Sequence, residues 1–70
     1  MRRIHLRAAR ERANLTQEQL AAKSGVDQRA ISKLELVVTN PSFDTAVRLA
    51  DALDVDPRTL KFGPDEQAVA

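Results

Sequence analysis

The sequence predicts an all-α domain of five short helices. Apolar residues recur at spacings of three and four, which places them on one face of a helix, while Gly, Pro and Asn residues divide the chain into segments of helical length. No segment shows a strand pattern. The 70 residues suffice for one domain with a small core, and the absence of cysteine excludes a disulfide. We therefore expect helix packing to provide the stability.

The first helix is expected over about residues 2–13. Leu6, Ala9 and Ala13 share one face at spacings of three and four. Asn14 can end this helix, because asparagine tolerates the left-handed backbone conformation.

Two further helices are expected to meet at Gly25, which reaches the left-handed conformation of a sharp turn at little cost. Thr16 can cap the first of them while Gln19, three residues later, reaches back to it in a capping box. Asp27 can cap the second. The inward positions of the pair hold Leu20, Ala21, Ile31 and Leu34. The outward positions of the second helix hold Gln28, Arg29, Ser32 and Lys33. These hydrogen-bonding groups and cations suit the base edges of a major groove.

A connector over residues 36–41 leads to a fourth helix, expected to begin near Ser42. Its predicted inner stripe is Phe43, Ala46, Val47, Leu49, Ala50 and Leu53. Asp56 and Pro57 then predict a cap and a first-turn proline that open a fifth helix, running to about Phe62. We expect residues 1–63 to form the domain and residues 64–70 to be a flexible tail.

The net charge of +1 hides an uneven distribution along the chain. Residues 1–35 carry eight Lys and Arg against four Asp and Glu, whereas residues 36–70 carry three against six. A polyanion would be attracted to the first half, which holds the polar helix face. The alternative is that this imbalance is chance in so short and so charged a chain.

These features together resemble the helix-turn-helix of Xre-type, lambda-repressor-like DNA-binding domains, with the motif at residues 16–36. The resemblance covers roughly residues 4–62 and rests on the Thr16-Gln17 start and on further residues in register: Leu6, Ala9, Arg10, Ala21, Gly25, Ile31 and Glu35. It also includes the Asn40-Pro41-Ser42-Phe43 stretch and the Ala-Leu pattern of residues 46–53. The resemblance implies a compact five-helix domain that binds double-stranded DNA.

Carried onto this sequence, the resemblance makes Gln28, Arg29, Ser32 and Lys33 the base-reading residues, because the second helix of the motif lies in the major groove. Glutamine can pair with adenine and arginine with guanine, serine is permissive, and Lys33 could reach guanine or phosphate. The alternative for all four is a solvated helix surface.

The resemblance also implies phosphate contacts and a structural pair. Gln17 opens a helix whose free N–H groups can meet a phosphate, and Thr39 and Asn40 resemble a second phosphate clamp. The alternative for Thr39 and Asn40 is a simple turn. Arg10 and Glu35 sit on the apolar sides of their helices and resemble an ion pair that joins the first helix to the reading helix, so we interpret them as structural.

The chain departs from the family pattern at Val37, where a glycine usually ends the reading helix. A β-branched residue resists the left-handed turn, so this helix is expected to end differently or to run longer. Val37 and Val38 are then either an exposed interface or part of the core packing. A dimer surface is predicted at Leu60 and Phe62, which could instead cover the core.

Composition and motifs exclude several other classes. His5 is the one histidine, expected on the surface of the first helix, and without cysteine there is no credible metal site. No nucleophile stands beside a base and no glycine-rich phosphate loop occurs, so neither an enzyme, a cofactor nor a small-molecule substrate is indicated. No apolar run is long enough for a membrane span or a secretory signal, which makes the cytoplasm the default location.

The sequence therefore predicts a sequence-specific, double-stranded DNA-binding transcriptional regulator of bacterial or phage origin, associated with the nucleoid. It is expected to act as a homodimer on a two-fold symmetric site. The alternative is an Xre-like antitoxin or bridging factor whose main contact is a partner protein.

Overall fold

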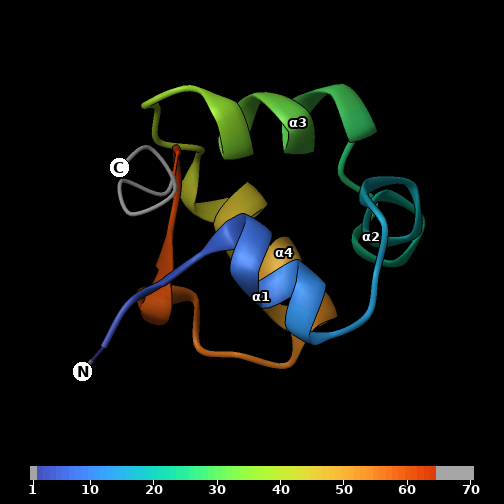
Figure 1. Ribbon diagram of the computed structural model, residues 1–70, viewed down its shortest axis with the longest axis horizontal. Helices are drawn as coiled ribbons and strands as arrows, with labels where there is room; N and C mark the ends of the chain where they lie inside the picture. Colours follow the sequence, from blue (N-terminus) through green and yellow to red (C-terminus); the bar gives the residue numbers. More distant parts are fainter. Residues whose placement is uncertain (1, 65–70) are drawn as a thin grey trace.

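The computed structural model describes residues 2–64, and in these residues four α-helices pack together beside a two-stranded parallel sheet (Figure 1). The helices are α1 (Leu6–Arg12), α2 (Gln17–Ser24), α3 (Gln28–Leu36) and α4 (Phe43–Leu53). The remaining elements are the strands β1 (Ile4–His5) and β2 (Leu60–Lys61) and a 3-10 turn, η1 (Pro57–Thr59). Apart from Pro64, the predicted tail lies outside the described residues.

Each helix contributes one large, fully buried side chain to the core. These are Leu6, Leu20, Ile31 and Leu49. In Figure 1, α1 crosses in front of α4, α3 lies along the top and α2 stands at the end where α3 begins. The remaining core is largely aliphatic, as the predicted inner faces required, with Leu34, Ala50 and Leu53 among its buried members.

The structure confirms the local signals of the motif. The Gln19 amide donates to Thr16 Oγ1 over 3.0 Å, and the Thr16 amide donates to Gln19 Oε1 over 2.8 Å, which completes the capping box. Gly25 has φ +75°, in the left-handed region. Asp27 accepts a 2.8 Å hydrogen bond from the Arg29 amide and caps α3. Asn14 also takes a left-handed conformation, with φ +59°.

The prediction of five helices is wrong for the described residues, because the segment after α4 forms η1 and β2 in place of a helix. Ile4 pairs in parallel with Leu60, and His5 with Lys61. Backbone pairing and the burial of Leu60 therefore favour the extended form over a helical turn. The same pairing shortens the first helix, which begins at Leu6 and not near Arg2. The expectation that no strand forms is also wrong.

α3 ends at Leu36 without a left-handed residue, since Val37 is extended, with φ −121° and ψ 140°. The Leu34 carbonyl near this end accepts a hydrogen bond from the amide of Gly63, over 2.6 Å. Gly63 has φ +100°, and a Cβ at this position would lie 3.3 Å from the Cα of Val38. The segment after β2 thus caps α3 from outside the helix, and the close approach requires a glycine.

Three further side chains lie where the sequence did not predict them. Ala13, expected on the inner face of the first helix, is exposed and directly follows the last residue of α1. Phe43, expected on the inner stripe of α4, is 78% exposed, because it occupies the first position of a helix whose core contacts begin farther along. His5, expected on the surface of the first helix, lies in β1 and is half-buried, and its buried Nε2 has no hydrogen-bond partner among residues 2–64.

Candidate nucleic-acid interface

The outward face of α3 is polar and open to solvent. Gln28, Arg29 and Lys33 are exposed and Ser32 is half-buried, whereas the opposite side of the helix buries Ile31, Leu34 and Glu35. Helical periodicity separates the two sides, since the buried residues are three and four positions apart. The four predicted base-reading residues are thus brought together on one helix, on the side away from the core.

The two cations of this face take part in no ion pair within residues 2–64. The surface ion pairs of that part of the chain are Arg7–Glu11, Arg48–Asp44 and Arg58–Asp56. Arg29 and Lys33 therefore have their charge available for an anionic partner or for acceptor groups on base edges.

A buried carboxylate anchors the far end of α3. Glu35 is 4% exposed. Its Oε2 accepts a 2.7 Å hydrogen bond from Arg10 Nε, and its Oε1 accepts a 3.1 Å bond from Arg10 Nη2, so the pair is bidentate. Arg10 Nη1 also donates to the carbonyl of Leu15 over 2.8 Å. These contacts tie α1, the turn after it and α3 into one unit.

The cationic form of Arg10 is stabilised in this pair. The hydrogen bonds to the Glu35 carboxylate raise the pKa of the Arg10 guanidinium above its usual range, and they outweigh burial, which acts to lower it. An arginine is cationic in proteins without such help. A buried charge with such partners stabilises the relative position of α1 and α3.

Gln17 joins the same cluster, which the sequence did not predict. Its side-chain amide donates to Glu35 Oε1 over 3.1 Å. An NH2 group has two hydrogens, so one remains for another acceptor. Gln17 is also the first residue of α2, where backbone N–H groups lack partners within the helix. Eighteen residues separate it from Glu35, and no periodic pattern in the sequence signals a contact between two helices that meet at a turn.

The remaining predicted site residues lie outside α2 and α3. In the connector between α3 and α4, Thr39 is half-buried and Asn40 is exposed. Of the two residues predicted for a dimer surface, Leu60 is buried within the monomer, while Phe62 is half-buried and packs against the core.

Residues 2–64 form neither a membrane-spanning helix nor a metal-binding cluster. None of the helices there has the length and apolar character needed to cross a membrane. In the same stretch, no three His, Asp or Glu side chains gather as ligands for a metal ion.

Comparisons with known proteins agree with this geometry. A family model described as "Helix-turn-helix" matches residues 6–60. An uncharacterized HTH-type transcriptional regulator, y4dL, from Sinorhizobium fredii is 41% identical over 51 residues, which are 73% of this chain and 26% of that protein. The chain thus spans about a quarter of the length of this curated relative. No solved structure matches the chain.

Proposed function

The chain belongs to the helix-turn-helix family of the Xre and lambda-repressor type, and we propose that it binds a specific sequence of double-stranded DNA and regulates transcription. The observation that carries this proposal is the outward face of α3, on which Gln28, Arg29 and Lys33 are exposed. An α-helix fits the width of the major groove, and these side-chain types match the donors and acceptors of base edges.

The reading residues divide by position along α3. Gln28 and Arg29 occupy its first turn, the part of a recognition helix that comes closest to the bases. Glutamine pairs with adenine and arginine with guanine, each through two hydrogen bonds that discriminate by about 1–3 kcal/mol. Ser32 accepts several bases, and Lys33, one turn farther, reaches a guanine or a phosphate.

Phosphate contacts fix the domain on the duplex without reading its sequence. Gln17 can contribute its second amide hydrogen and the free N–H groups at the start of α2. Because the Gln17 side chain also donates to Glu35, its orientation is already fixed by the buried cluster when it contacts a phosphate. Thr39 and Asn40 form the second phosphate contact of this proposal.

The domain acts as a homodimer in this proposal. Two copies related by a two-fold axis match two half-sites about one helical turn (~34 Å) apart, and binding to both adds affinity. The sequence predicts a dimer surface at Leu60 and Phe62, with core packing as the alternative. Because Leu60 is buried within the monomer and Phe62 packs against the core, we favour the alternative for these two residues and place the dimer contact elsewhere.

Selection of bound duplexes from a random pool tests the DNA proposal directly. Enrichment of a two-fold symmetric sequence supports both specific binding and the dimer. Enrichment of an asymmetric single site supports base recognition by α3 but contradicts the dimer. No enrichment contradicts sequence-specific binding.

Salt dependence of the affinity then separates DNA binding from a protein-binding role. The logarithm of the affinity for the selected duplex should fall against the logarithm of salt concentration with a slope of about −0.9 for each phosphate neutralised. Lys33→Ala should weaken binding, whereas Arg58→Ala is a matched control, because Arg58 is exposed and already paired with Asp56. A flat salt response contradicts the proposal and favours an antitoxin or bridging role.

A further inference from the structure

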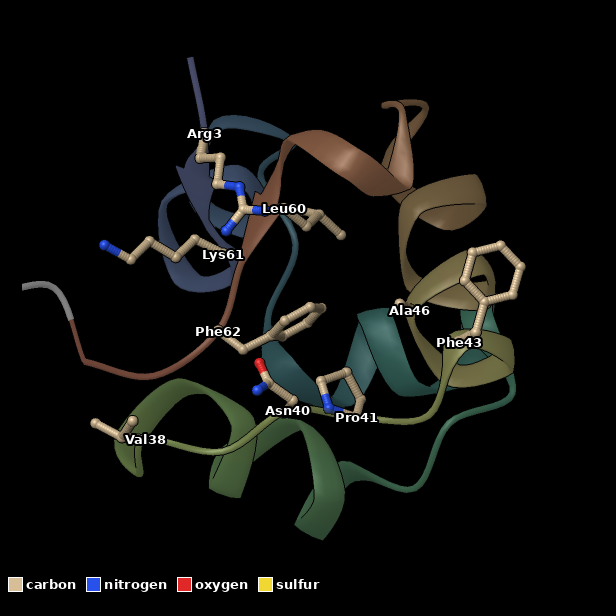
Figure 2. A pocket seen from close by; sticks show the side chains of 9 residues that line it. All are labelled: Arg3, Val38, Asn40, Pro41, Phe43, Ala46, Leu60, Lys61 and Phe62. Atoms are coloured by element: carbon tan, nitrogen blue, oxygen red, sulfur yellow. The ribbon is translucent and has the colours of Figure 1, made fainter. Parts of the chain in front are cut away.

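A groove of about 480 Å³ opens between β2, the connector after α3 and the first turns of α4 (Figure 2). Its apolar lining comes from these three segments: Val38, Pro41, Phe43, Ala46, Leu60 and Phe62. In Figure 2 the ring of Phe62 points into the space between β2 and α4. None of the residues of α3 proposed to read bases lines this groove.

The exposed apolar residues of the described chain are concentrated beside this groove. The large apolar side chains with the greatest exposure are Leu36, Val37, Val38 and Phe43, all between the end of α3 and the start of α4. Val38 is 85% exposed and Phe43 is 78% exposed, and both line the groove. Single exposed apolar residues are ordinary, whereas exposed apolar residues that line a hollow are typical of a surface that another molecule covers.

Two cations stand at the strand side of the groove. The pairing of Ile4 with Leu60 sets the segment before β1 beside β2, and Arg3 and Lys61 both line the groove as a result. Both side chains are exposed, and neither joins an ion pair among residues 2–64. Among residues 2–64, the lining contains no carboxylate. Within the described part of the chain, the groove therefore combines an apolar wall with a positive rim that has no counter-charge.

We propose that this groove docks an acidic peptide segment of a partner protein, with carboxylates against Arg3 and Lys61 and apolar side chains against Val38, Phe43 and Phe62. Charge complementarity selects this occupant. In a two-fold contact between copies of the chain, the same patch is used twice, so each positive rim would face a lining that supplies no carboxylate from residues 2–64. A nucleic-acid backbone would satisfy the cations but would leave the apolar wall uncovered.

The test uses two short synthetic peptides in a fluorescence polarisation assay with the full chain and no DNA, so that its outcome does not depend on the proposed function. One peptide alternates Leu and Phe with Asp and Glu, and the other replaces every Asp and Glu with Lys. We expect the acidic peptide to bind at least about tenfold more tightly, a difference of about 1.4 kcal/mol. Equal binding of the two peptides would overturn the proposal.

Variants locate the binding. Arg3→Glu with Lys61→Glu should reverse the preference between the peptides, and Val38→Asn should weaken both. Arg12→Glu and Leu36→Asn are matched controls, since they change an exposed cation and an exposed apolar residue outside the lining and should leave affinity unchanged. All of these side chains are exposed, so circular dichroism should show unchanged folding. An unchanged peptide affinity in Val38→Asn would place the binding elsewhere and overturn the proposal.

Three outcomes would assign the groove to another occupant and overturn the proposal. If Val38→Asn converts a dimer to a monomer in sedimentation, a second copy covers the groove. If a duplex of random sequence displaces the acidic peptide, the groove binds nucleic acid. If Asp65→Asn with Glu66→Gln strengthens peptide binding more than about tenfold, the chain's own residues 65–70 compete for the groove.

Discussion

The two ends of α3 are held by different means. At its start, Asp27 caps the helix from two residues away, and Gly25 makes the turn that precedes it. At its end, the contacts come from distant parts of the chain: Arg10 binds Glu35, and the Gly63 amide binds the Leu34 carbonyl. The end that carries the proposed reading residues is thus encoded locally, and the opposite end depends on the rest of the fold.

This difference assigns separate tasks to the two ends. Local caps and turns form without any long-range contact, so they can set the geometry of the first turn of α3 directly from sequence. The long-range contacts instead fix how the whole helix sits on the core. Changes at the distant end should therefore reduce stability, and changes on the exposed face near the start should alter DNA recognition alone.

Arg10→Met should produce the largest effect, because it leaves the buried Glu35 carboxylate without its cation. We expect a loss of about 3–5 kcal/mol in the free energy of unfolding, measured by urea denaturation. DNA affinity should fall only in proportion to the unfolded fraction. Normal stability with abolished binding would make Arg10 a DNA contact and would contradict the structural role of this end of α3.

Two controls distinguish the loss of the pair from the loss of an arginine. Arg7→Met removes a cation from the exposed pair with Glu11, 3.7 Å long, and should cost no more than about 1 kcal/mol. Adding Glu35→Leu to Arg10→Met removes the unpaired carboxylate and should restore much of the stability.

Gly63→Ala tests the other long-range contact at the end of α3. The left-handed φ and the close approach to the Val38 backbone predict a loss of about 2–3 kcal/mol. Gly25→Ala is the matched control, with a left-handed φ but a nearest neighbour, Arg48 Nη1, that is the tip of an exposed side chain 3.6 Å away. It should cost about 1–2 kcal/mol.

Hydrogen exchange gives a second readout of the same contact. The Val37 amide, which donates to the Lys33 carbonyl over 2.9 Å, should exchange faster in Gly63→Ala and not in Gly25→Ala. Equal exchange rates of the Val37 amide in the two variants would mean that the last turn of α3 is stable without the contact from Gly63.

Arg29→Ala tests the locally encoded end. The Arg29 side chain is exposed and its backbone amide, which the substitution retains, makes the bond to Asp27, so stability should change little. Affinity for the selected duplex should fall by about 1–3 kcal/mol, with preference relaxed at one base position, as measured on a set of single-base site variants. Uniform weakening on all sites would show that Arg29 contacts only the backbone.

The same division explains what could be predicted from the sequence. The capping box, the turn at Gly25 and the cap at Asp27 each involve residues within three positions of one another, so they can be predicted from residue spacing. The outward placement of Gln28 and Arg29 follows from helical period alone. Whether these side chains contact bases stays a prediction.

The features that were missed all depend on long-range packing. β1 and β2 are separated by most of the chain, and two-residue strands leave no alternating pattern, so a helix was expected in place of β2. Periodicity placed Phe43 on the inner stripe, because it does not show where along that stripe the core begins. The bond from Gln17 to Glu35 depends on the angle between α2 and α3.

Asp56→Asn should have the smallest effect on the free energy of unfolding. It tests whether the charge of Asp56, which caps η1, helps to stabilise the segment that leads into β2. Hydrogen bonds from the Arg58 side chain and amide lower the pKa of the Asp56 carboxyl below its ordinary 3.8. At pH values between the lowered pKa and the ordinary one, Asp56 binds a proton in the unfolded chain but not in the folded chain. The contribution of Asp56 is therefore complete above the ordinary pKa and is lost as the pH falls through the folded one.

Urea denaturation from neutral pH down to about pH 3 measures this contribution, since the acid titration of an ordinary aspartate spans that range. Asp56→Asn should lose less stability on acidification than the unmodified chain. Asp51→Asn is the control for the loss of a carboxylate, because the Asp51 side chain accepts no hydrogen bond from residues 2–64. If Asp56→Asn keeps the full slope, the Asp56 charge contributes nothing beyond what a neutral asparagine cap supplies, and the pairing of Leu60 with Ile4 is the long-range contact that remains to hold this segment.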